Sequence, residues 1–78
     1  MKDVEYGKIH IKLAQIMKSQ GISINRLACR AEMQRTQLKA YMSGEVQRVD
    51  LAVLARLCYV LECDISDLLE YSDEEIME

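Results

Sequence analysis

The chain has 78 residues, half of them apolar, with three glycines and without proline, phenylalanine or tryptophan. This length fits one domain with a small core, and the composition favours helices joined by short turns over a sandwich or barrel. The net charge of −3 is segregated, because residues 6–56 hold nine Lys or Arg against three acids while residues 57–78 hold eight acids and no Lys or Arg. The basic portion keeps nucleic acid among the possible partners of an acidic chain.

Several classes of protein are not expected from this sequence. No stretch approaches the ~18 consecutive apolar residues of a membrane span, and the start MKDVEYG lacks the apolar segment of a signal peptide. The three cysteines are an odd number without the spacing of metal ligands. No nucleophile, base or phosphate-cradling glycine loop indicates an enzyme. We therefore expect a cytoplasmic protein without metal ion, cofactor, small-molecule ligand or membrane partner.

The first two helices are predicted in the basic part of the chain. The first covers residues 7–20, where apolar side chains recur at helical spacing: Ile9, Leu13, Ile16 and Met17. Gly21 ends this helix in the left-handed conformation that glycine adopts at low cost. Ser23 is a suitable N-cap for a second helix of about two turns, with Leu27 facing inward.

The segment MQRTQLKAYMSG, residues 33–44, predicts a third helix over residues 34–42 after a short break. At about 100° per residue, Leu38, Tyr41 and Met42 share one side and are expected in the core. The outer side carries Thr36, Lys39 and Ala40, flanked by Arg35 and Gln37. By pattern alone, this outer side is either solvated surface or a binding surface.

Two further helices complete the predicted all-α fold. Asp50 can cap a fourth helix over residues 51–62, whose apolar face includes Leu51, Leu54, Leu57, Cys58 and Leu61. A short fifth helix over residues 65–70 closes the core with Ile65, Leu68 and Leu69. The predicted domain therefore covers residues 1–70, and residues 71–78 form an acidic tail.

Two short helices joined by a three-residue break, within five helices, outline a helix-turn-helix unit. Three segments are similar to the Cro/repressor type of helix-turn-helix regulator, also called the lambda-repressor-like or Xre family, and together span about residues 9–70. LAQIMKSQGISINRLA resembles the first two helices, EMQRTQLKAYMSG the turn, recognition helix and loop, and VDLAVLARLCYVLECDISDLLEY the fourth and fifth helices. The resemblance implies a compact five-helix, lambda-repressor-like fold and a transcriptional regulator that binds double-stranded DNA.

The resemblance also implies which residues contact DNA, with the third helix in the major groove. The base-reading positions carried over are Gln34, Arg35, Thr36, Gln37, Lys39 and Ala40. Arginine donates two hydrogen bonds to guanine, threonine donates or accepts, and small apolar groups contact the thymine methyl. The phosphate-binding positions, with nearby cations, are Lys18, Ser23, Ile24, Ser43, Gly44 and Arg48.

Two residues depart from the family pattern and keep a second interpretation open. Ile24 stands where many members have a polar residue, usually Gln, so its backbone amide is the group left to hold a phosphate. Glu32 stands where the turn usually has Gly, at a cost on the order of 1 kcal/mol. The alternative function is a protein-interaction module, antitoxin-like or anti-regulator, without specific DNA binding. Salt dependence separates the two, since neutralising Z phosphates gives a log–log slope of about −0.9Z.

A homodimer is expected, because family members usually bind paired half-sites as two-fold dimers. Apolar residues without an obvious place in the monomer core are the candidate dimerisation residues: Val53, Tyr59, Val60, Tyr71 and Ile76.

Overall fold

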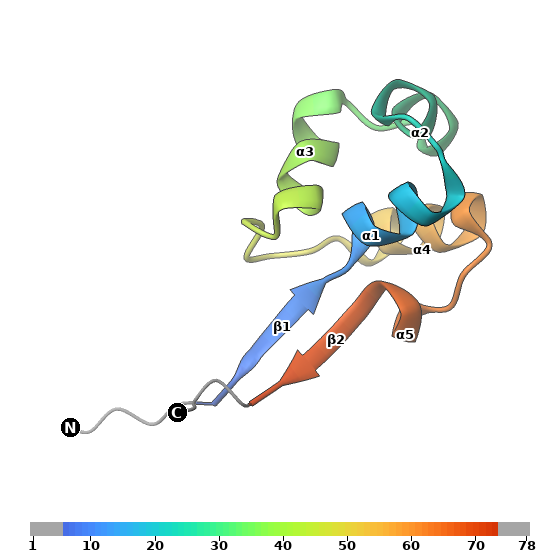
Figure 1. Cartoon of the computed structure of the whole chain (residues 1–78). Helices are drawn as coiled ribbons and strands as arrows, with labels where there is room; N and C mark the ends of the chain where they lie inside the picture. Colours follow the sequence, from blue (N-terminus) through green and yellow to red (C-terminus); the bar gives the residue numbers. More distant parts are fainter. Residues whose placement is uncertain (1–5, 74–78) are drawn as a thin grey trace.

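The computed structural model describes residues 6–73, which form five helices and a two-stranded antiparallel ribbon around one core (Figure 1). The elements in chain order are β1 (Lys8–Ile11), α1 (Leu13–Gln20), α2 (Ile24–Ala31), α3 (Arg35–Ser43), α4 (Leu51–Leu61), α5 (Ile65–Leu68) and β2 (Leu69–Ser72). The predicted five-helix, all-α class is confirmed, and the ribbon is a small addition to it. None of the helices in this range is long and apolar enough to cross a membrane.

The helix ends follow the capping residues expected from the sequence. The Ser23 hydroxyl accepts a hydrogen bond from the Arg26 amide at 3.1 Å, and the Asp50 carboxylate accepts one from the Ala52 amide at 2.8 Å. Gly21 ends α1 with a φ of 69°. These local interactions satisfy backbone groups that a helix leaves without partners at its ends.

The core lies between the five helices and is built mainly from leucine. Each helix contributes at least one fully buried leucine, and these residues are Leu13, Leu27, Leu38, Leu57, Leu61 and Leu68. Burying one such side chain contributes about 1.5–3 kcal/mol. Tyr41 is buried as predicted, and its hydroxyl accepts a hydrogen bond from the Asp50 amide at 3.2 Å. This bond ties the inner side of α3 to the start of α4.

The predicted helix over residues 7–20 is wrong in its first part, where β1 replaces it. Ile9 and Ile11 alternate with polar residues, and this two-residue period suits a strand. The strand pairs with β2, so that Ile9 lies opposite Tyr71 and Ile11 opposite Leu69. Ile9, expected in the core, is therefore 62% exposed on the ribbon. Figure 1 shows the ribbon extending away from the helices.

The predicted fifth helix is too long at its C-terminal end. Leu69 has an extended backbone, with φ −120° and ψ 143°, so α5 ends at Leu68 and β2 begins. Ile65, expected in the core, is 48% exposed, and Leu68 is the buried residue of this single turn. Strand β2 continues to Ser72 and includes Tyr71, past the predicted domain end at residue 70. Ile76, a predicted dimerisation residue, lies outside the described residues.

The side of α4 that faces the core differs from the prediction at two residues. Val53, expected on the dimerisation surface, is only 2% exposed and belongs to the core. Leu51, expected to face inward, is 78% exposed. The buried arc consists of Val53, Leu54, Leu57 and Leu61. Because apolar residues surround α4 on nearly all sides, its periodicity does not indicate which side faces the core.

Candidate nucleic-acid interface

Helices α2 and α3 are joined by a tight turn over residues 32–34. The Met33 amide donates to the Ala28 carbonyl oxygen at 2.9 Å, and the buried Met33 side chain anchors the turn in the core. Glu32 occupies the left-handed region with φ 56°, as expected for this turn. Two short helices held by such a turn constitute a helix-turn-helix unit, which forms the top of the molecule in Figure 1.

The polar side of α3 faces solvent because its other side is held in the core. Leu38 and Tyr41 are buried on the inner side of the helix. Five predicted base-reading residues are exposed, and Ala40 is partly buried: the exposed ones are Gln34, Arg35, Thr36, Gln37 and Lys39. The structure therefore places the six predicted residues on one helix and its N-cap, with an exposed polar surface above a buried apolar one.

A shallow hollow of about 420 Å³ lies along this side of α3. It is lined by Thr36, Lys39, Ala40, Ser43 and Glu45. The small Ala40 side chain leaves room between two longer side chains, a shape that suits a methyl group. The Glu45 carboxylate at the end of the hollow disfavours a phosphate at that position.

The N-terminus of α2 presents polar groups on the same part of the molecule. The Ser23 hydroxyl oxygen is used as the helix cap, and its hydrogen remains free to be donated. Ile24 is the first residue of the helix, and its side chain packs partly against the core. Its backbone amide is among the first amides of α2, which have no partner within the helix. Such a terminus favours an anion. Lys18, on the last turn of α1, is exposed.

In the loop after α3, the predicted phosphate donors form hydrogen bonds within the protein. The Ser43 hydroxyl donates to the Ala40 carbonyl oxygen at 3.2 Å, and the Gly44 amide donates to the Tyr41 carbonyl oxygen at 3.3 Å. Gly44 has φ 78° and ends α3. These bonds close the helix, so the exposed side chains of Gln47 and Arg48 are the solvent-facing donor groups at this loop.

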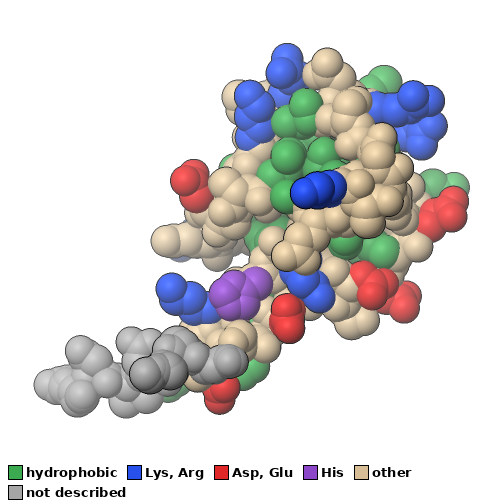
Figure 2. Space-filling view, viewed as in Figure 1, with side chains coloured by type: hydrophobic (Ala, Val, Ile, Leu, Met, Phe, Trp, Pro, Cys, Tyr) green, Lys and Arg blue, Asp and Glu red, His purple; other side chains and the backbone are tan. Residues whose placement is uncertain are grey.

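The charge of the helix-turn-helix unit is positive. Figure 2 shows Lys and Arg side chains over the upper part of the molecule and most acidic side chains over the lower part and right edge. Within residues 6–73, Lys12 and Glu70 form an ion pair at 3.8 Å beside the ribbon, and the cations of α2 and α3 in this range form none. Arg26 and Arg30 of α2 are exposed cations that were not assigned to the site from the sequence. The absence of acids between residues 6 and 31 was the available signal.

Comparison with known domains gives the family of this unit. The Cro/C1-type helix-turn-helix DNA-binding domain matches residues 12–74. The chain belongs to this family. The match covers both helices of the helix-turn-helix unit, α4, α5 and β2, and the predicted resemblance is thereby confirmed. No curated protein sequence gives a match.

Solved structures share the fold of this Cro/C1-type domain. A Bacteroides fragilis protein proposed to bind DNA superposes with a TM-score of 0.72 at 14% identity, over 81% of this chain and 100% of that one. The transcriptional regulator VanUg gives 0.67 at 18% identity, over 95% and 100% of the two chains. SinR, the master regulator for biofilm formation, was solved in complex with DNA and gives 0.64 at 20% identity, over 69% and 86%. At these sequence identities, the similarity to the three structures shows a shared fold only.

Proposed function

We propose that this protein is a transcriptional regulator that recognises a specific sequence in double-stranded DNA as a homodimer, with α3 in the major groove. The observation that carries the proposal is the exposed polar side of α3, fixed on a buried apolar side within a Cro/C1-type domain. A helix held in this way presents its side chains from a fixed backbone, so binding does not have to order the backbone, which lowers the entropic cost of recognition.

Arg35 is the residue on which sequence recognition depends most. It opens α3, and its exposed guanidinium has no carboxylate partner among residues 6–73. A bidentate contact with guanine discriminates against other bases by about 1–3 kcal/mol. Thr36 follows in the same turn, and Ala40 lies four residues further along the same side, where the hollow suits a thymine methyl. Gln34, Gln37 and Lys39 border these residues.

Phosphate contacts would position the helix in the groove. The N-terminus of α2, with the Ser23 hydroxyl and the Ile24 amide, is the anion site favoured by helix geometry. Lys18, on the last turn of α1, and Arg48, in the loop after α3, add positive charge. Because Ser43 and Gly44 donate within the protein, we assign them to shaping the loop and expect Arg48 to make its phosphate contact.

The proposal is tested by selecting bound sites from random duplex DNA with the native chain and with Arg35→Ala. Lys8→Ala is the matched control, because it removes one exposed cation from the ribbon, away from the helix-turn-helix unit. We expect a two-fold symmetric motif that loses information at one position per half-site in Arg35→Ala, with binding about 5- to 150-fold weaker for each half-site. Lys8→Ala should keep the motif.

Absence of any enriched sequence with the native chain would contradict the proposal, as would a motif unchanged by Arg35→Ala. Affinity measured over a range of salt concentrations adds a second criterion. Each phosphate neutralised should contribute about −0.9 to the log–log slope. An affinity for DNA that does not change with salt concentration would instead favour the protein-interaction function.

A further inference from the structure

Helix α4 is apolar on its outer side as well as on its inner side. Its sequence, LAVLARLCYVL, contains a single charged residue, Arg56. Four apolar residues are exposed on the side opposite the core, and we call them the α4 outer face: Leu51, Ala52, Ala55 and Tyr59. Leu51 is 78% and Tyr59 84% exposed. A helix that is apolar all round is normally covered on both sides, so the outer face is expected to have a partner.

The spacing of this face makes it complementary to itself. Leu51 and Tyr59 each lie four residues from Ala55, so the three side chains follow one another along the helix surface. If two copies pack antiparallel about Ala55, Leu51 of each copy meets Tyr59 of the other. The small Ala52 and Ala55 side chains allow the helix axes to approach to about 8–10 Å. Such pairing of one patch with the same patch is what a two-fold contact requires.

We propose that the α4 outer face binds the same face of a second copy of this chain. The contact supplies the dimer of the proposed function, although it forms in the free protein and does not depend on DNA binding. The four residues of the outer face carry no charge, and the nearby charged groups can stay in water: Arg56 lies at the edge of the face, and Glu62 lies at the exposed C-cap of the helix.

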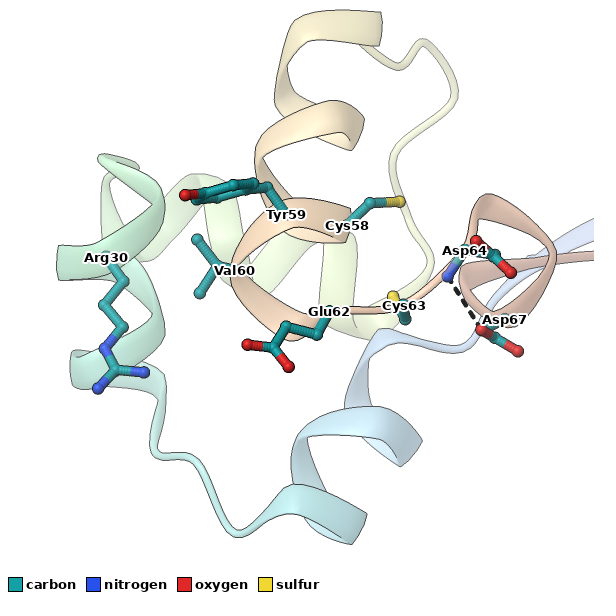
Figure 3. A pocket seen from close by; sticks show the side chains of 8 residues that line it. All are labelled: Arg30, Cys58, Tyr59, Val60, Glu62, Cys63, Asp64 and Asp67. Atoms are coloured by element: carbon teal, nitrogen blue, oxygen red, sulfur yellow. Dashed lines mark hydrogen bonds between the residues drawn. The ribbon is translucent and has the colours of Figure 1, made fainter.

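The α4 outer face is bordered by a hollow at the C-terminal end of the helix. A hollow of about 720 Å³ lies there, between α4, the end of α2 and the start of α5. Figure 3 shows Tyr59 and Val60 on the side of the hollow that faces Arg30, with Cys58 and Cys63 on the other side of α4. Leu51 of a second copy, packed against Tyr59, would therefore lie at the rim of this hollow, whose lining also includes the charged residues Arg30, Glu62, Asp64 and Asp67.

The area of the face predicts a weak dimer. A tyrosine buries about 150–250 Å² when covered, so two copies of Tyr59 and of Leu51 together fall short of the ~1,200 Å² typical of stable interfaces. Two half-sites on one DNA duplex would hold the copies together and raise their effective concentration. The ribbon is the alternative contact surface, because Ile9 and Tyr71 on its strands and Tyr6 just before β1 are also exposed, while Ile11 and Leu69 pack against the core.

Sedimentation equilibrium of the full chain, from micromolar to high micromolar concentration, tests the contact. We expect reversible dimerisation that Tyr59→Lys and Leu51→Lys each weaken at least about tenfold. Both side chains are mostly exposed, so neither change should alter the fold. Ile9→Lys, which places the same charge on the exposed ribbon, is the matched control and should leave the dimerisation constant unchanged. A monomeric native chain, or a dimer disrupted by Ile9→Lys and not by Tyr59→Lys, would overturn the proposal.

Cross-linking gives an independent positive test. In a Cys29→Ser background, which removes the exposed cysteine, Ala55→Cys should form a disulfide-linked dimer under oxidising conditions because Ala55 lies on the two-fold axis. Lys8→Cys in the same background should cross-link no faster than random collision, and equal rates for the two variants would count against the contact.

DNA binding to a single half-site distinguishes the dimer contact from the DNA contact. Tyr59→Lys should bind DNA that contains a single half-site as tightly as the native chain does. If the native chain bound no DNA, the proposed function would be refuted, but the sedimentation experiment would still test the α4 contact.

Discussion

Replacing Gly7 with alanine tests whether the ribbon packs as the structure shows. A Cβ at Gly7 would lie 2.6 Å from the Ser72 carbonyl oxygen and 2.8 Å from the Tyr71 hydroxyl oxygen. That hydroxyl donates to the Tyr6 carbonyl oxygen at 2.6 Å, so it is not free to move. Gly21 provides a matched comparison, because its φ is also positive and nothing lies within 4 Å of its Cβ position.

Both substitutions place an alanine in left-handed backbone, and only Gly7→Ala also overpacks the structure. Left-handed backbone costs an alanine about 1–2 kcal/mol, offset by about 0.4–1 kcal/mol because alanine restricts the unfolded chain. Gly21→Ala should therefore lower the free energy of unfolding by about 1 kcal/mol. Gly7→Ala adds overpacking against a backbone oxygen, typically about 1–3 kcal/mol. Gly7→Ala should therefore lower the free energy of unfolding by about 2–4 kcal/mol in total. The loss would be smaller if the two strands of the ribbon separated and so relieved the overpacking.

Urea denaturation measures the global loss, and amide hydrogen exchange distinguishes a separated ribbon from a destabilised core. If the strands separate, amides of β1 and β2 should lose protection in Gly7→Ala while amides of α3 and α4 keep theirs. Equal unfolding free energies for Gly7→Ala and Gly21→Ala, together with unchanged exchange in the strands, would refute the packing of the ribbon.

Three further predictions concern strained backbone and thiols. Glu32→Gly and Glu62→Gly should each raise the free energy of unfolding by about 0.5–1 kcal/mol in urea melts, because both residues have positive φ, whereas Glu32→Ala should give no gain. Burial raises the pKa of the Cys63 thiol, with the neighbouring thiol and carboxylates adding to the effect, so iodoacetamide should label exposed Cys29 first at pH 8. Since the unfolded chain releases this proton at lower pH than the folded one, stability should fall as pH rises above about 8.5, and Cys63→Ala should reduce that fall.

The sequence alone determined the features that depend on neighbouring residues. The caps at Ser23 and Asp50, the left-handed ends at Gly21 and Glu32, and the buried side of α3 at Tyr41 follow from interactions within a few positions. The family was also accessible, because its motifs lie in continuous segments. Capping and helical spacing act locally, so a linear pattern is sufficient to predict them.

Tertiary structure decided the features that depend on distant residues. Residues 8–11 form a strand because a partner from the other end of the domain pairs with Ile9 and Ile11, and local spacing does not reveal that partner. The orientation of α4 was open for a different reason: with apolar residues on all sides, packing of the other helices selects Val53 for the core and leaves Leu51 outside. The α4 outer face, and with it the proposed dimer contact, therefore became visible only in the folded chain.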